Sequence, residues 1–128
     1  MVILDTNIVI DHLRTLGKKE SYLVKLSKTQ PKDDLAISVL TIQELFTGKS
    51  TLNTDQEKNL LAAIAPLKVL PYTFQVAKLA GQISRDSKDE IEFVDIAIAS
   101  TAIVNDALLF TLNRKDFSNI KDLELFNL

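Results

Sequence analysis

The chain has 128 residues, of which 46% are hydrophobic and 25% are charged, with a formal net charge of −2. This length suits one domain, so we expect a single domain over residues 1–128 with a sizeable hydrophobic core. The absence of cysteine excludes disulfides, thiolate metal sites and a cysteine nucleophile. One histidine cannot supply the paired imidazoles of most catalytic zinc sites, and no GxxxxGK[ST] or GxGxxG motif is present to cradle a phosphate.

The near-neutral charge does not by itself indicate nucleic-acid binding, which usually leaves a strongly basic surface, but a local basic rim is compatible with it. No basic segment precedes a long apolar stretch at the N-terminus, so no signal peptide is predicted. The longest apolar runs fall far short of the roughly 18–20 residues that cross a bilayer. We therefore expect a soluble cytoplasmic protein with no membrane partner.

The first half of the chain alternates short apolar runs with amphipathic segments. An aliphatic run at residues 2–4 is typical of a buried strand, and polar residues 5–7 lead into a capped helix over 8–13. Gly48 stands where the C-cap glycine of a helix belongs. The further elements predicted here are an amphipathic helix (18–28), a turn (31–34), a strand (35–38) and a helix (39–47).

The second half continues this alternation and contains the most apolar segment. Thr54-Asp55-Gln56-Glu57 has the pattern of a capping box, which opens a helix that stops near Pro66. Residues 93–104 are apolar nearly all round and rich in alanine, which predicts a buried helix. The further predicted elements are a brief strand (69–70), a helix (74–83), a turn (105–106), a strand (108–111) and a last edge strand (123–126).

Short strands that alternate with helices predict an α/β fold, in which a central, mainly parallel sheet of four to five short strands is sandwiched between helices. Ligands of such sheets bind beyond the carboxyl ends of the strands. Asp5 stands at the end of the first strand and Asp116 follows the strand at 108–111, so both face one crevice if these strands are neighbours. Glu44 and Asp95 are two further acids, and they interrupt apolar helices.

Each of these acids also has an ordinary explanation. A helix cap explains Asp5, a solvated helix face explains Glu44, and the helix dipole explains Asp95. Asp116 fits an ordinary turn. Together, however, four carboxylates at one crevice repel one another unless they are protonated or neutralised. Mg²⁺ and Mn²⁺ prefer oxygen ligands of this kind, and over carboxylates they activate water for phosphodiester hydrolysis.

The polar positions fall into four ordered segments that cover nearly the whole chain. These segments are Leu4-Asp5-Thr6-Asn7, Glu44-Leu45 with Gly48, Asp95-Ile96-Ala97-Ile98-Ala99, and Thr111-Leu112-Asn113 with Asp116-Phe117. In this order and spacing they resemble the motifs of PIN-domain ribonucleases and, within that family, of VapC-type toxins from bacterial and archaeal toxin–antitoxin pairs. Family members often have a glycine before the last core strand, where this chain has Asn105-Asp106, and both residues tolerate left-handed backbone.

The resemblance implies a PIN-like α/β/α sandwich and a Mg²⁺- or Mn²⁺-dependent endoribonuclease that hydrolyses RNA phosphodiester bonds. It also implies a homodimer that a cognate antitoxin protein neutralises. The residues to which the resemblance gives metal-binding and catalytic roles are Asp5, Glu44, Asp95 and Asp116. The residues to which it gives supporting roles are Thr6 and Asn7, with Thr111 and Asn113 positioning water or phosphate.

A basic rim around the acidic site is a further hypothesis, for RNA binding, although each base alone is more typical of solvated surface. The residues of this rim are Arg14, Lys49, Arg85, Arg114 and Lys115. The segment 85–92, in contrast, is more acidic than suits a loop that faces RNA.

Two alternatives to a ribonuclease stay open. The first is a phosphoryl-transfer domain with a nucleophilic aspartate, which needs a second acid beside Asp5 and a lysine near a later strand; here Thr6 and Asn7 follow Asp5, and Lys68 precedes its strand. The second is a catalytically silent PIN-like module that binds RNA or protein. Metal binding separates a metal site from a scaffold, and turnover separates an enzyme from a binding module.

Overall fold

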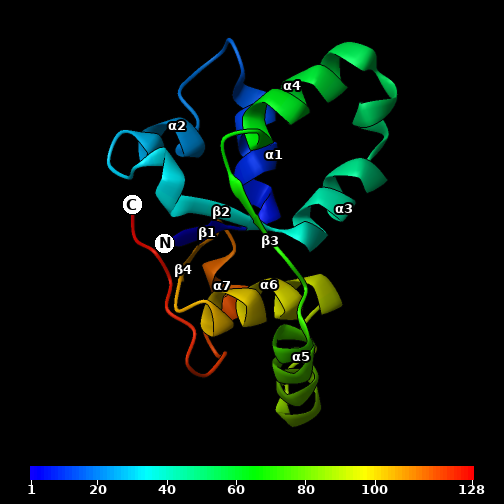
Figure 1. The fold of residues 1–128 in the computed structure, drawn as a ribbon, viewed down its shortest axis with the longest axis vertical. Helices are drawn as coiled ribbons and strands as arrows, with labels where there is room; N and C mark the ends of the chain where they lie inside the picture. The colour runs from blue at the N-terminus through cyan, green and yellow to red at the C-terminus, as the bar shows by residue number, and fades with distance from the viewer.

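The computed structural model describes residues 1–128 and contains a four-stranded sheet with helices on both faces (Figure 1). The strands are β1 (Val2–Leu4), β2 (Leu35–Ser38), β3 (Lys68–Leu70) and β4 (Leu108–Phe110). They lie in the order β3-β2-β1-β4, and every pair is parallel. The predicted α/β sandwich is confirmed, and the sheet is parallel throughout.

Seven α-helices and two short 3-10 helices connect the strands. The α-helices are α1 (Thr6–Thr15), α2 (Tyr22–Ser27), α3 (Val39–Thr47), α4 (Thr54–Ile64), α5 (Phe74–Asp86), α6 (Phe93–Val104) and α7 (Arg114–Phe117). The 3-10 helices are η1 (Lys32–Asp34) and η2 (Lys49–Leu52). None of these helices combines the length and the apolar composition that crossing a bilayer requires.

Alternating side chains of the strands build two separate cores, one on each face of the sheet. In β1, Val2 and Leu4 belong to the core beneath α1, α2 and α4, whereas Ile3 belongs to the core beneath α6 and α7. Side chains of a strand point to opposite faces in turn, so a strand covered on both sides must be apolar at every position. This requirement explains why Val2–Leu4 and Leu35–Ile37 are apolar throughout, whereas the buried Ser38 at the end of β2 caps α3 with its hydroxyl.

The turn that leads into β4 has the backbone conformation expected of it. Asp106 has a φ of 51°, in the left-handed region that aspartate and asparagine enter at lower cost than most residues. The turn therefore forms without a glycine, and it brings β4 alongside β1.

Several predicted boundaries were wrong for local reasons. The second helix begins at Tyr22 rather than at residue 18, because the Ser21 hydroxyl caps it by accepting from the Val24 N–H. Asn53, and not Thr54, caps α4. Residues 123–126 form only an isolated bridge between Leu125 and Leu109 rather than a fifth strand.

Two further differences concern the conformation of Gly48 and a short helix near the C-terminus. Gly48 is the C-cap of α3, as predicted, but it has an extended conformation with a φ of −68° and a ψ of 152°, because it is also the N-cap of η2. The short helix α7 was not predicted, since its four residues are too few to show a helical period.

Candidate functional site

The site begins where β1 and β4 end side by side. Asp5 directly follows β1 and caps α1, its Oδ1 accepting from the Thr6 N–H at 2.8 Å. Thr111 directly follows β4, and its hydroxyl donates to Oδ2 of Asp5 at 2.7 Å. The sequence predicts that Asp5 and Asp116 face one crevice if their strands are neighbours, and β1 and β4 are neighbours in the sheet. Both oxygens of this 5% exposed carboxylate are therefore held by donors.

All four acids singled out in the sequence line one cleft of about 580 Å³ at the carboxyl end of the sheet. Asp5 lies between β1 and α1, Glu44 on α3, Asp95 in the first turn of α6, and Asp116 on α7. Four segments that are distant in the sequence thus converge on one space. The cleft is where open parallel sheets usually bind ligands.

Glu44 is held from α1. The Thr6 hydroxyl is hydrogen-bonded to Oε1 of Glu44, and the same hydroxyl oxygen lies 3.0 Å from Oγ1 of Thr41. Thr41 is buried and lies one helical turn before Glu44 on α3. Two elements, α1 and α3, therefore share one small polar network at the wall of the cleft.

Thr111 is placed to hold Asp5 and does not line the cleft. It is 3% exposed, and its oxygen accepts from the Asn113 N–H at 3.0 Å and from Nδ2 of Asn7 at 3.4 Å. The expectation that Thr111 positions water or phosphate does not fit this burial. Thr6, Asn7 and Asn113, in contrast, do line the cleft.

Burial and mutual repulsion raise the pKa of two of the acids. Desolvation raises the pKa of Asp5, and the charges of Glu44 and Asp116 add to this, while the hydrogen bonds from Thr111 and Thr6 oppose it. Desolvation also raises the pKa of Asp95, to about 6, together with the charges of four surrounding acids. Those four acids are, in order of effect, Asp5, Glu92, Asp116 and Glu44. Neither Asp5 nor Asp95 forms an ion pair with a lysine, arginine or histidine side chain.

Three more acids line the cleft that the motifs did not identify. They are Asp89, Glu90 and Glu92, from the segment between α5 and α6. The acidity of this segment was visible in the sequence, but its position facing the cleft depends on how α5 packs on α6. Lys115 is the one cationic side chain among the lining residues.

Most of the predicted basic rim lies away from the cleft. Arg14, Lys49, Arg85 and Arg114 are not among its lining residues. Arg85 pairs with Asp86 at 2.8 Å, and Arg114 donates to the main-chain oxygen of Phe126 at 3.0 Å.

The atoms that the cleft offers as ligands to a metal ion are oxygens of carboxylate, hydroxyl and amide groups. Such oxygens suit a hard divalent cation such as Mg²⁺ or Mn²⁺ rather than a soft one. As the side chains stand, no three acidic or histidine residues are close enough together to hold one ion. Coordination by three or more of these acids therefore requires them to move toward one another.

The electrostatics predict how the metal-free protein responds to Asp95→Asn. Because folding raises this pKa, the folded state binds more protons, and stability falls as pH rises from about 4 to about 6. Above pH 6 the substitution should therefore stabilise the protein, by about 1 kcal/mol or roughly 3–5 °C after allowance for solvent screening. Thermal melts in chelator at pH 4 and pH 7.5 measure this. A lower melting temperature for the variant at pH 7.5 would contradict the claim that the buried charge of Asp95 and its repulsion by neighbouring acids destabilise the metal-free protein.

Comparison with known proteins agrees with this geometry. Residues 2–123 match the family described as PIN domain. The chain is 33% identical to Ribonuclease VapC10 of Mycobacterium tuberculosis, over 97% of this chain and 91% of that protein. It is 32% identical to Ribonuclease VapC19 of the same organism, over 97% and 98%.

A solved structure has the same fold. The crystal structure of VapBC2 from Rickettsia felis, bound to a DNA fragment from its promoter, contains a chain that superposes with a TM-score of 0.86 and 25% identity. The match covers 100% of this chain and 99% of that one. The chain described here belongs to the PIN-domain family, among its VapC-type members.

Proposed function

We propose that this protein is a divalent-metal-dependent endoribonuclease, the toxin of a toxin–antitoxin pair. The observation that carries the proposal is the convergence of four carboxylates from four segments on one cleft. The full-length similarity to two ribonucleases named VapC supports RNA as the substrate. We further propose that residues 1–128 act as one domain, because both cores pack against the same sheet.

Asp5, Glu44, Asp95 and Asp116 are the residues that would hold Mg²⁺ or Mn²⁺. When bound, such an ion supplies an activated water and stabilises the leaving oxygen of a phosphodiester. The hydrogen bonds from Thr6 and Thr111 favour the ionised form of Asp5 and so oppose the rise in its pKa that burial causes. Asp95, with its raised pKa, releases its proton more readily when a cation is near, so acid pH should weaken binding of the ion.

Phosphate contacts in the cleft would come from few side chains. Lys115 and Asn113 line it and offer donors to a phosphate, and we propose them as the nearest RNA contacts. Arg14, Lys49, Arg85 and Arg114 would act only on RNA that extends beyond the cleft. Because every charged residue of the lining except Lys115 is acidic, a bound metal ion would offset the repulsion that an RNA phosphate meets there.

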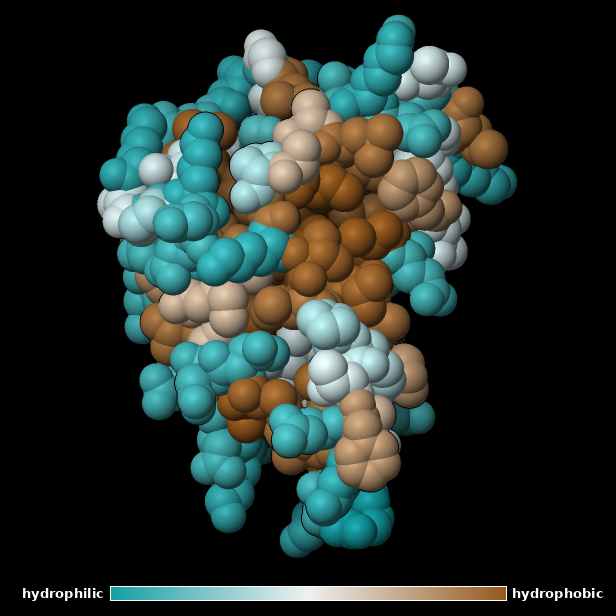
Figure 2. All heavy atoms as spheres, in the orientation of Figure 1, coloured by the Kyte–Doolittle hydropathy of each residue, from teal (hydrophilic) through white to brown (hydrophobic).

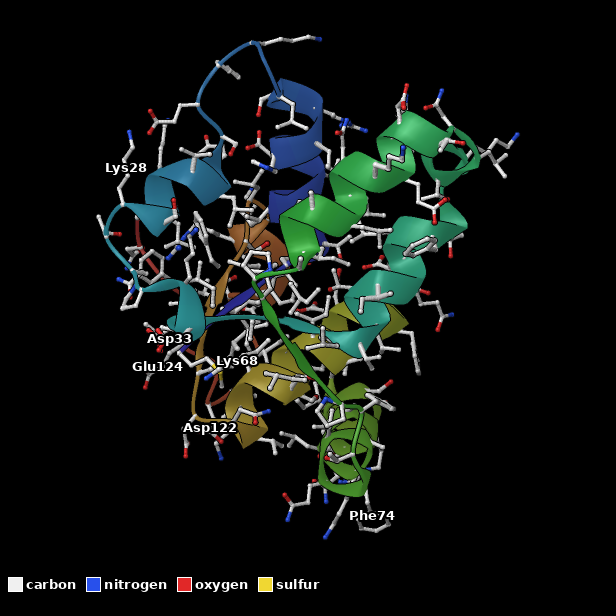
Figure 3. All side chains as sticks on the ribbon, turned by 45° about the horizontal axis from the view of Figure 1, so that its top comes forward. Lys28, Asp33, Lys68, Phe74, Asp122 and Glu124 are labelled. Atoms are coloured by element: carbon white, nitrogen blue, oxygen red, sulfur yellow. The ribbon has the colours of Figure 1, made fainter.

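A phosphoryl-transfer domain with a nucleophilic aspartate fits the geometry less well. Each oxygen of Asp5 accepts a hydrogen bond, which weakens it as a nucleophile but leaves a lone pair for a metal ion. Lys68 opens β3 at the end of the sheet opposite the cleft, and Figure 3 shows it on the same side of the molecule as Asp33, which precedes β2.

An antitoxin partner is supported by the solved neighbours. Besides the VapBC2 structure, they include a toxin–antitoxin complex from Klebsiella pneumoniae. Figure 2 shows apolar side chains gathered on the face of β3 and the facing parts of α3 and α4, where Phe46 and Leu61 are exposed. We propose that the antitoxin covers this apolar surface. Co-expression of the protein with the products of the two neighbouring genes tests whether it has an antitoxin partner, and the absence of any complex would contradict that partner.

A homodimer is supported by a second apolar surface, beside the cleft. A hollow of about 340 Å³ between α3 and α6 is lined by Leu40, Phe93 and Val94, and it includes Glu44. Phe93 is 69% exposed, which is unusual for the start of an otherwise buried helix. We propose that a second copy of the chain covers this hollow.

Phe93→Ser tests the dimer. Sedimentation of the unmodified protein should give the mass of two chains, and the variant should shift at least tenfold toward the monomer, since a buried aromatic residue is lost. Phe74→Ser is the matched control, because Phe74 is also highly exposed, at 83%, but stands at the start of α5, where Figure 3 shows it at the tip of the molecule. A wild-type monomer, or equal effects of both variants, would refute this interface.

The function itself is tested by cleavage of a pool of structured RNAs. Purified protein should give discrete products with Mg²⁺ or Mn²⁺, none with chelator, and at least a hundredfold less product for Asp95→Asn. The variant also controls for contaminating nucleases, since we expect it to fold at least as well as the wild type. RNA that binds tightly but stays intact would support a silent binding module instead. Cleavage that persists in chelator would contradict the metal-dependent mechanism.

A further inference from the structure

Thr41 is a buried polar residue for which the motifs provide no role. It is 0% exposed, it does not line the cleft, and its hydroxyl contacts only the hydroxyl of Thr6, at 3.0 Å. A buried hydroxyl in a helix commonly bonds to the carbonyl four residues earlier, as Thr101 does with Ala97 at 2.7 Å. Thr41 instead forms its hydrogen bond with Thr6 on another helix, α1.

The direction of this hydrogen bond follows from counting protons. Thr6 has one hydroxyl proton, and its oxygen is in contact with both Thr41 and the carboxylate of Glu44. An ionised carboxylate can only accept. The Thr6 proton therefore goes to Glu44, and Thr41 must be the donor to Thr6. The three groups form a chain in which each donor strengthens the next.

Asp5 is held by a similar arrangement. The Thr111 oxygen accepts from two N–H groups, those of Asn113 and Asn7, which leaves its single proton for Asp5. Two acids are thus each held by a threonine whose proton is directed by further donors. On the Asp5 side the donors include a main-chain amide, whereas on the Glu44 side the only donor is Thr41.

We propose that Thr41 is a positioning residue for Glu44, acting through Thr6. Its hydroxyl directs the Thr6 proton onto the carboxylate and so keeps Glu44 turned toward the cleft for a metal ion. This inference rests on the proposed function, in which Glu44 is one of the residues that hold the ion. Partners of metal-binding side chains typically change metal affinity by 10- to 100-fold when they are removed.

Thr41→Val tests the proposal, because it keeps the shape of the side chain and removes only the hydroxyl. Calorimetric titration with Mn²⁺ should show an affinity about tenfold weaker than that of the wild type, and Thr41→Ser should restore it to within about twofold. The matched control is Thr101→Val, which removes a buried helical hydroxyl that has no contact with the cleft. It should lose thermal stability but keep the wild-type affinity for Mn²⁺.

A double substitution separates positioning from a general effect on folding. In a Glu44→Gln background, Thr41→Val should change Mn²⁺ affinity by less than twofold, since the group that it positions is gone. Wild-type affinity in Thr41→Val, or a loss that Thr41→Ser does not rescue, would overturn the role of Thr41 while leaving the proposed function intact. Absence of Mn²⁺ binding by the wild-type protein would instead overturn the proposed function, and this inference with it.

Discussion

The repulsion among carboxylates gathered at one end of a parallel sheet is the constraint on which the rest of this structure depends. Asp5 is almost completely buried, Asp95 has its pKa raised to about 6, and no cation offsets either shift. Such an arrangement costs stability, and this cost falls when a bound cation neutralises the charge. A site held in this state is prepared for a divalent ion, because binding the ion relieves the repulsion that folding creates.

The fold both creates this repulsion and limits it. Parallel strands end at the same edge, so Asp5 after β1 and Thr111 after β4 necessarily meet, and α3, α6 and α7 deliver the other acids to the same place. The hydroxyls of Thr6 and Thr111 then hold two of the carboxylates without adding charge. The same threonines therefore stabilise an ionised acid in the metal-free protein and orient it for an ion.

Much of this arrangement was predictable from the sequence, because it depends on local patterns. The limits of α6 were predicted to the residue, since an apolar helix rich in alanine has few other interpretations. The convergence of the four acids followed from strand ends and from acids in apolar helices. The role of Thr41 was not predictable, because its partner lies on another helix. The position of Glu92 was not predictable either, because it depends on the packing of α5 against α6. The prediction of the α4 cap missed Asn53, because neighbouring polar residues compete for the same role.

Anomalous diffraction from crystals grown with Mn²⁺ would show whether the gathered carboxylates bind a divalent ion. We expect one or two anomalous peaks inside the cleft, bonded to oxygens of Asp5 and Asp95, with Glu44 still accepting from Thr6. We also expect the acids to lie closer together than in the metal-free protein, because the ion replaces their repulsion with attraction. A cleft without anomalous density at saturating Mn²⁺, in crystals where all four carboxylates are ordered, would contradict metal binding by these carboxylates.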